Sequence, residues 1–210
     1  MSDDTHLTDL QLVQEVGQLL TTLHLSEVLR HIVNLTQRIT RATRISLLFE
    51  DKGRWMYYTH GHDFTDSEES FIAREIVNRG FSGWLIRHQR GSIIHDIMTD
   101  DRWYKFPDYF QEVRSAVGVP LTYRDKTLGA LVASHPDVGY YGDQHLHLLH
   151  TLSMQASVAI YNAQTFALLE AQKRQLHAVL QAVPDVLLVL DENSCVLMAS
   201  DAIVQLLDGL

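Results

Sequence analysis

The chain has 210 residues, and its 46% hydrophobic and 20% charged content is ordinary for a folded globular protein. The formal net charge is −9, and because an acidic chain repels phosphate backbones, nucleic acid is not an expected partner. The single cysteine cannot form an internal disulfide, the acidic N-terminus does not resemble a signal peptide, and no apolar run could cross a bilayer, so we expect a cytoplasmic protein without direct membrane contact.

Two helices are predicted at the start of the chain. Thr8–Gln11 has the pattern of a capping box, which begins a helix within residues 1–24. From Leu25 to Ile39 the apolar residues recur at helical spacing, which predicts a second helix that ends near Ala42.

A hairpin and two helices are expected next. The strands Ile45–Phe49 and Trp55–Thr59 are separated by the turn signal Asp51–Gly53. A helix that begins near Asp66 and ends at Gly80 follows, and a shorter one then runs from Ser82 to Gly91.

The middle of the chain predicts three more strands around a long loop. Ser92–Ile97 is a strand pattern, and the stretch from Met98 to Arg114 is rich in aromatic residues. A long loop of this kind usually folds back on a core or a cavity. Ser115–Tyr123 and Thr127–Ser134 predict an antiparallel hairpin, so the expected fold class is α+β, an antiparallel sheet flanked by helices.

A long helix is predicted from Gly142–Asp143 to Val183, where Pro184 stops it. Its apolar residues lie on two opposite faces. One face carries Leu149, Leu152, Ala156, Ile160 and Ala163, and the other carries Met154, Val158 and Tyr161 with His147 and His150 alongside. A helix that covers only its own domain needs one apolar face, so the second face predicts another partner, either the N-terminal helix or a second subunit.

The last residues predict the beginning of another domain. Val186–Leu190 and Cys195–Ala199 are strand patterns joined by a turn, and a helix begins at Ala202. Because a lone hairpin cannot bury a core, we expect that the sequence ends inside a second domain.

Six segments of the chain, in this order and spacing, resemble the GAF family. They are Gly80–Leu85, Gly91–Asp96, Asp100–Trp103, Arg114–Leu121, Lys126–Leu131 and Gln155–Ala163. With the leading helices, the resemblance covers about residues 7–165. It implies a central antiparallel sheet with a small-ligand pocket on one face and, on the other face, helices that commonly form parallel dimers.

Residues 174–210 resemble the start of a PAS domain. Ala182–Asp185 and Val189–Asp191 carry this resemblance, although Ser200 stands where the family usually has Asn. The expected organisation is an N-terminal helix (1–24), a GAF-like sensor domain (25–165), a coiled-coil linker helix (166–183) and a truncated PAS-like start (184–210).

The two resemblances imply a sensory module of a bacterial signalling protein, such as a sensor histidine kinase, with downstream PAS and output domains as partners. We expect it to be non-catalytic, since the sequence has no Gly-x-Ser-x-Gly elbow. It would bind an unidentified small molecule, form a homodimer, or both. Two alternatives stay open: a ligand-free dimerisation domain, and a haem- or metal-binding sensor or enzyme.

Aromatic and polar residues near the expected pocket are the candidate ligand contacts, although the same residues could simply fill the core. They are Trp55, Tyr57, Phe81, Trp84, His95, Trp103, Tyr109, Val119 and Ser134.

The long helix carries the candidate dimer and signalling residues. Beside Met154, Val158 and Tyr161, a seam of approximately seven-residue spacing comprises Leu152, Ala159, Ala163, Phe166, Leu176 and Leu180.

No cofactor is expected, although three groups of histidine residues could bind a metal or haem. His145, His147 and His150 could bind zinc across a dimer, and His60 with His62 could bind a metal; a polar helix end and a turn are the simpler interpretations. His95 is the best candidate for a haem ligand, and a hydrogen-bonded histidine is again simpler. The GAF-like region lacks cysteine, which argues against a covalently attached bilin and against the free methionine sulfoxide reductases of this family.

Overall fold

The computed structural model describes residues 24–59, 66–105, 112–182 and 188–199. The helix predicted within residues 1–24 and the one predicted after Ala202 lie outside these ranges. The chain divides into two units, Met1–Gln164 and Thr165–Leu210, and each is described by itself.

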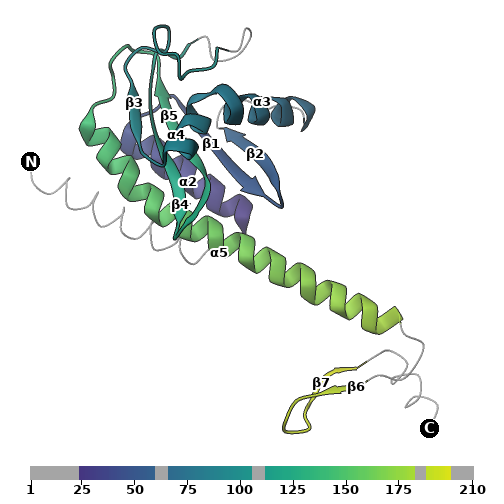
Figure 1. The fold of residues 1–210 in the computed structure, drawn as a ribbon. Coiled ribbons are helices and arrows are strands. Elements are labelled where there is room, and N and C mark those ends of the chain that lie inside the picture. Colours follow the sequence, from purple (N-terminus) through teal and green to yellow (C-terminus); the bar gives the residue numbers. More distant parts are fainter. Residues whose placement is uncertain (1–23, 60–65, 106–111, 183–187, 200–210) are drawn as a thin grey trace, which may run out of the picture. The chain divides into compact units, whose positions relative to one another are not determined.

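The first unit is built on one five-stranded sheet in which all neighbouring strands are antiparallel (Figure 1). The strand order is β2-β1-β5-β4-β3. The strands are β1 (Arg44–Asp51), β2 (Arg54–Thr59), β3 (Ser92–Ile94), β4 (Ser115–Tyr123) and β5 (Lys126–His135).

One face of the sheet packs against two helices, α2 (Leu25–Thr40) and α5 (Asp143–Ala182). Alternate residues of β1, such as Ile45 and Leu47, point to this face and join the largest buried cluster. From α5, Leu149, Ala156 and Ile160 are buried in the same cluster. The apolar face predicted for the long helix toward its own domain is therefore present.

The opposite face is covered by α3 (Asp66–Arg79) and α4 (Phe81–His88). The two helices approach closely at Gly83, where a Cβ atom would lie 1.9 Å from the carbonyl oxygen of Val77. Only a residue without a side chain fits there, and this contact sets how α4 lies beside α3.

The expected α+β class and antiparallel sheet are confirmed. One strand is shorter than predicted, since β3 ends at Ile94 and not at Ile97. Beyond it, the Asp96 carboxylate accepts a hydrogen bond from the Met98 N–H at 3.0 Å, and the Asp96 carbonyl accepts one from the Thr99 N–H at 3.2 Å. These bonds turn the chain away from the sheet.

The second unit comprises the C-terminal part of α5 and a two-stranded antiparallel hairpin, β6 (Leu188–Leu190) and β7 (Val196–Ala199). The two strands agree with the hairpin predicted from the sequence. Among the described residues, no helix combines the length and apolar character that a membrane crossing requires.

Candidate ligand pocket

A small cavity lies on the sheet face that α3 and α4 cover. Its volume is about 30 Å³, enough to hold a water molecule but far smaller than a pocket for a drug-sized ligand. The described residues that line it come from both sheet and helices: Ser46, Tyr57, Ile76, Gly80, Phe81, Ser82, Trp103, Tyr104, Val132 and Ser134. Half of these carry a hydroxyl group, and none carries a charge, an imidazole or a thiol.

The strands contribute hydrogen-bonding groups at positions that point away from α2 and α5. The Ser46 hydroxyl and the Tyr57 hydroxyl are 2.7 Å apart and share a hydrogen bond. Burial raises the pKa of Tyr57, and the hydrogen bond from Ser46 offsets this only in part. The phenol is therefore neutral at physiological pH and can both donate and accept.

Ser134 adds a third hydroxyl from β5. It is buried, and its Oγ donates to the backbone oxygen of Arg44 at 3.3 Å. Because a hydroxyl has two acceptor lone pairs, Ser134 keeps the capacity to accept a hydrogen bond from a molecule in the cavity.

Aromatic side chains form the other wall. The rings of Phe81 and Trp103 lie 6.5 Å apart at a tilt of 37°. Phe81 begins α4, whereas Trp103 and Tyr104 belong to the loop after β3. The shape of this wall therefore depends on how that loop is held.

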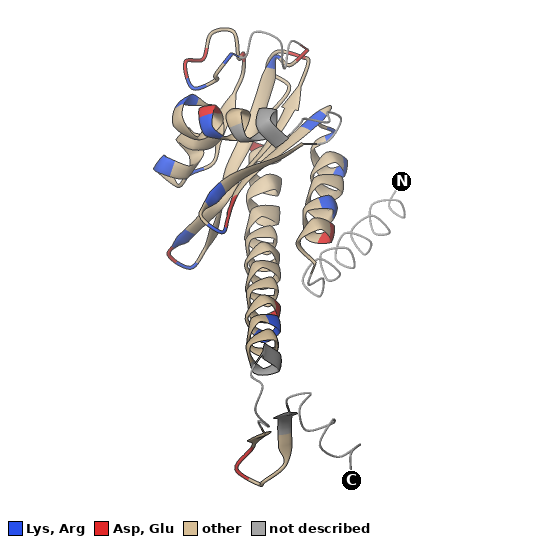
Figure 2. Ribbon diagram, turned by 90° about the vertical axis from the view of Figure 1, so that its right-hand side faces the viewer, with Lys and Arg blue, Asp and Glu red and all other residues tan. Residues whose placement is uncertain are grey.

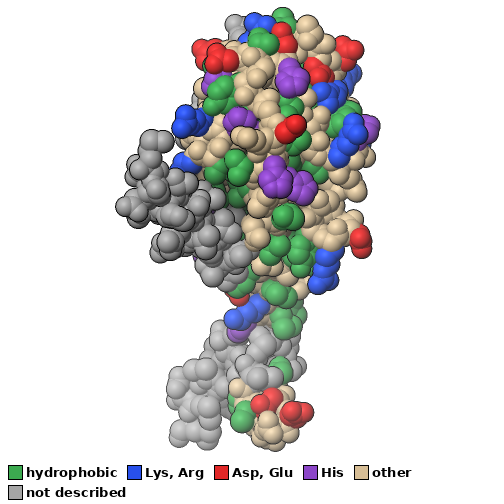
Figure 3. All heavy atoms as spheres, turned by 90° about the vertical axis from the view of Figure 1, so that its left-hand side faces the viewer, with side chains coloured by type: hydrophobic (Ala, Val, Ile, Leu, Met, Phe, Trp, Pro, Cys, Tyr) green, Lys and Arg blue, Asp and Glu red, His purple; other side chains and the backbone are tan. Residues whose placement is uncertain are grey.

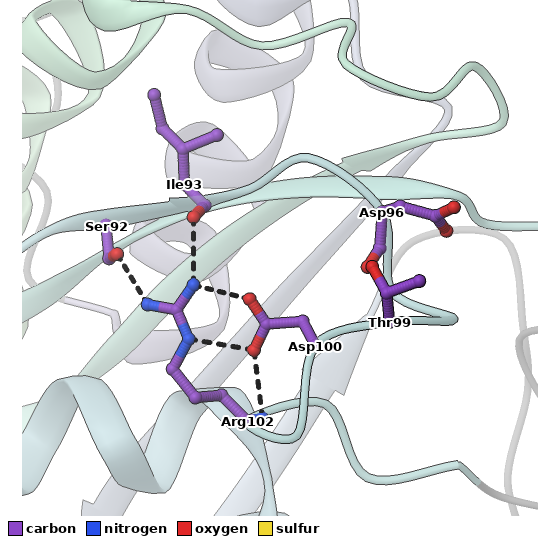
Figure 4. Close-up of polar contacts among 6 residues, drawn as sticks. All are labelled: Ser92, Ile93, Asp96, Thr99, Asp100 and Arg102. Carbon is purple, nitrogen blue, oxygen red and sulfur yellow. Dashed lines mark hydrogen bonds and ion pairs between the residues drawn. The ribbon is translucent and has the colours of Figure 1, made fainter.

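Arg102 fixes the loop to the edge strand (Figure 4). Its guanidinium binds both carboxylate oxygens of Asp100, with Nε–Oδ1 at 2.8 Å and Nη2–Oδ2 at 2.6 Å. It also donates to the Ser92 hydroxyl at 2.7 Å and to the Ile93 carbonyl at 3.1 Å. We refer to Ser92, Ile93, Asp100 and Arg102 as the Arg102 network.

The same guanidinium lies over two aromatic rings of α4. Its central carbon is 5.5 Å from the centre of the Phe81 ring and 5.0 Å from that of Trp84. Hydrogen bonding to Arg102 lowers the pKa of Asp100, and Asp100 raises the pKa of Arg102. Both groups stay charged at neutral pH, so the network ties the loop, the edge strand and α4 together.

A second ion pair holds the start of the loop near the start of β4. Arg114 donates to Asp96 with Nη2–Oδ2 at 2.8 Å and Nε–Oδ1 at 3.3 Å. The hydrogen bond from Arg114 is the largest cause that lowers the pKa of Asp96. This ion pair ties the chain just after β3 to the residue that precedes β4.

Four of the nine candidate ligand contacts line the cavity, namely Tyr57, Phe81, Trp103 and Ser134. Trp84 lies outside it, stacked on His88 at 4.3 Å, and His95 is exposed. Trp55 packs against α3 beside the cavity, and Tyr109 lies outside the described residues.

Val119 differs most from the expectation, because it lies on the opposite face of the sheet in the core with α2 and α5. Its neighbour Gly118 faces the α4 side, where a Cβ atom would meet Leu85 at 2.6 Å and Phe81 at 2.9 Å. Side chains alternate along a strand, so one residue of offset reverses the face.

Sequence reasoning missed six residues that line the cavity: Ser46, Ile76, Gly80, Ser82, Tyr104 and Val132. A signal existed for Ser46. It is a polar residue in the apolar run Ile45–Phe49, and buried polar side chains need partners.

The candidate metal ligands are dispersed. His147 and His150 are exposed, and Nδ1 of His145 accepts a hydrogen bond from the Gly142 N–H at 3.3 Å. Within residues 24–59, 66–105, 112–182 and 188–199, no three His, Cys, Asp or Glu side chains form a metal-binding group. His60 and His62 lie outside these ranges.

The candidate dimer residues of α5 divide into two sets. Leu152, Ala159 and Ala163 are buried in the core of their own domain, so they cannot also contact another subunit. Met154 is 50% exposed, while Val158 and Tyr161 are half-buried.

In the second unit, Phe166 is half-buried and Leu176 is exposed. The backbone of Leu180 belongs to α5, and its side chain lies outside the described residues.

Comparison with known proteins identifies the fold. A family model described as GAF domain matches residues 22–160. The GAF domain of an Acinetobacter phosphoenolpyruvate-protein phosphotransferase superposes with a TM-score of 0.62 at 20% identity, over 79% of this chain and 97% of that chain. No curated protein sequence matches the chain significantly.

Two further solved structures share the fold at lower identity. Free methionine-R-sulfoxide reductase from Neisseria meningitidis, solved with its substrate, has a TM-score of 0.59 at 12% identity, over 73% of this chain and 88% of that chain. The GAF domain of a two-component sensor histidine kinase from Bacillus halodurans has a TM-score of 0.53 at 12% identity, over 70% and 99%.

Proposed function

The chain belongs to the GAF domain family, and from this premise we propose that it is a non-catalytic sensory module of a signal-transduction protein. It binds a small molecule in the cavity and relays binding through α5 to a paired second copy. One observation carries the proposal: a single sheet separates the hydroxyl-lined cavity from α5, whose outer face is uncharged.

The chemistry of the cavity favours a small neutral ligand. Its described lining offers hydroxyl groups and aromatic rings but no charged side chain to pair with an ionised ligand. At about 30 Å³ the cavity must widen for anything larger than a few atoms. The wall formed by Trp103 and Tyr104 belongs to a loop and not to the sheet, so it is the part of the cavity that would move on widening.

A path from the cavity to α5 passes through β4. Phe81 touches the cavity and lies against Gly118. The adjacent Val117 and Val119 are buried in the cluster that contains α5 residues such as Ala156. Because cores are close-packed, a displacement of Phe81 on widening would shift β4 and the helix behind it.

The outer face of α5 supports pairing with a second copy. Between Asp143 and Glu170 the helix has no Lys, Arg, Asp or Glu, and Figure 2 shows this length without charged residues. Leu148 is 43% and Met154 50% exposed, and Figure 3 shows histidine and hydrophobic side chains on this side of the molecule. Interface centres are depleted of charge in this way.

Two further parts of the proposal concern the second unit. Leu168, Leu169 and Leu176 are exposed on the C-terminal part of α5, and pairing as a coiled-coil linker over residues 166–183 would cover them. On the resemblance carried by Ala182–Asp185 and Val189–Asp191, we also propose that a PAS domain starts at about residue 184. We propose a sensor histidine kinase as the parent protein and a cytoplasmic location.

The small size of the cavity favours a second candidate function, a ligand-free dimerisation domain. Native mass spectrometry of the full chain distinguishes the two. Ser134→Val fills the cavity, and Ser26→Val, at an exposed position on α2, is the matched control. The proposal predicts a small-molecule adduct on the unaltered protein and on Ser26→Val that is absent from Ser134→Val. An unaltered protein without an adduct would support the ligand-free function.

A further inference from the structure

A second concave site lies between the edge strand β2 and α3, and it shares no described lining residue with the cavity. It is a groove of about 290 Å³ lined by Arg54, Trp55, Arg74, Val77 and Asn78, which we call the β2–α3 groove. Figure 2 faces the side of the molecule on which β2 and α3 lie. Its volume is close to the lower limit of small-molecule sites.

Two cations border the groove, and the described side chains provide no counter-charge for either. Arg54 on β2 and Arg74 on α3 are both exposed, and neither forms an ion pair with any described residue. The guanidinium of Arg74 lies 5.9 Å from the centre of the Phe71 ring. In a chain of net charge −9, two arginines at one groove without an ion-pair partner among the described residues form a local site for an anion.

The described acidic residues nearest to Arg54 and Arg74 do not form ion pairs with them. On α3, Glu75 is bound to Arg79 at 3.6 Å. Asp51 lies opposite Arg54 in the register of β1 and β2, but the two side chains form no ion pair. Arg87 from α4 donates to the Val77 carbonyl at 2.8 Å and brings a third guanidinium to the same end of α3.

The remaining lining suits a planar ring. Trp55 is half-buried, so its indole has a fixed orientation and an accessible part. Asn78 is exposed and offers an amide that can both donate and accept. A guanidinium matches phosphate oxygens in a bidentate geometry, and an indole stacks on flat rings.

We propose that the β2–α3 groove binds a small anion whose phosphate is attached to a planar ring, of the size of a nucleoside monophosphate. Arg54 and Arg74 bind the phosphate, Trp55 stacks on the ring, and Asn78 bonds to its polar edge. This site is independent of the ligand that the cavity binds.

Isothermal titration of the full chain at low salt tests the proposal with three probes. Adenosine monophosphate carries ring and charge, adenosine only the ring, and inorganic phosphate only the charge. The monophosphate should bind at least tenfold more tightly than either fragment. Arg54→Gln and Arg74→Gln should each weaken its binding by about tenfold, as expected for one charge-assisted contact near the surface.

Arg79→Gln is the matched control, because it removes the same charge from α3 at a residue already paired with Glu75. It should change the affinity by less than about twofold, since Arg79 does not line the groove and Glu75 already offsets its exposed charge. In NMR spectra, the indole N–H signal of Trp55, assigned with Trp55→Phe, should shift on addition of the monophosphate.

Three results would each overturn the proposal. One is monophosphate binding that is no tighter than phosphate alone. Another is that Arg79→Gln and Arg54→Gln weaken monophosphate binding equally, which would mean that only the net charge of the chain matters. The third is a shift of the Trp103 signal with Trp55 unchanged, which would place the probe in the cavity.

Discussion

Arg102→Met should lower the free energy of unfolding by about 2–3 kcal/mol, which is more than a surface substitution usually costs. The change keeps the approximate length of the side chain but removes the guanidinium's hydrogen bonds to Asp100, Ser92 and Ile93. Asp100 then keeps the backbone N–H of residue 102 as a donor, at 2.9 Å. The loop that positions Trp103 loses its attachment to the edge strand.

The magnitude follows from the exposure of the pair. Hydrogen bonds to charged groups contribute about 1.5–3 kcal/mol when buried. The side chains of Arg102 and Asp100 are 26% and 21% exposed, so solvent reduces their mutual contribution to about 1 kcal/mol. The bonds to Ser92 and Ile93 add about 0.5–1 kcal/mol each. In a domain of this size the total lowers Tm by roughly 5–10 °C.

A double-mutant cycle with Asp100→Asn isolates the pair, with urea unfolding of each variant as the assay. The double variant should be less destabilised than the sum of the single variants by about 1 kcal/mol. Arg90→Met is the control, because the contact of Arg90 among the described residues is stacking over Trp84 at 5.2 Å, and it should cost less than about 0.5 kcal/mol. A coupling indistinguishable from zero would refute the inference that the Arg102 network holds the loop.

Two further predictions concern the packing of α4 against α3 and the buried hydroxyl of Tyr57. Gly83→Ala should destabilise the domain by about 3 kcal/mol or more, because the added Cβ atom would overlap the Val77 carbonyl. Gly142→Ala is the control: it has open space around it and should cost about 1 kcal/mol or less. Equal urea midpoints for the two variants would contradict this prediction. Tyr57→Phe should reduce the loss of stability at alkaline pH. Burial raises the pKa of Tyr57 in the folded state above its value in the unfolded chain, so the unfolded chain releases this proton first. The contribution of the neutral phenol to the free energy of unfolding is complete below about pH 10 and is lost as the pH rises toward the folded-state pKa. The measurement is the drop in urea midpoint between about pH 8 and about pH 11. An equal drop in the unaltered protein and in Tyr57→Phe would disprove the raised pKa of Tyr57.

Much of the fold could be predicted because local patterns and tertiary structure agree. The turn signal Asp51–Gly53 joins β1 and β2 as expected, and Gly53 has a φ of +78°, which a glycine adopts without strain. The two faces of α5 were recognisable from helical spacing alone. A turn and a helix face depend on residues that are close together along the chain, so both can be recognised in the sequence.

The lining of the cavity could be predicted only in part. Strand β4 is buried on both faces, so the alternation of apolar and polar residues that would show which way Val119 points is absent. The Arg102 network was not foreseen either. Its bonds to Ser92 and Ile93 depend on the path of a loop, and loop paths carry no periodic signal.

The proposed seam of α5 shows a related difficulty. Leu152 and Ala159 are seven residues apart, and this spacing occurs both in helix faces buried in a domain and in faces exposed for pairing. The spacing alone therefore does not show which face of α5 packs against the sheet. The structure places both in the domain core and leaves Leu148 and Met154 on the outer face. Pairing between copies should therefore use that outer face.

Analytical ultracentrifugation tests most directly whether the outer face of α5 pairs two copies of the chain. At micromolar concentration the unaltered protein should sediment at twice the monomer mass. The double variant Leu148→Glu with Met154→Glu should sediment as a folded monomer, while Met98→Glu, an equivalent change at an exposed residue outside α5, should stay dimeric. A monomeric unaltered protein, or a double variant that stays dimeric, would contradict the account.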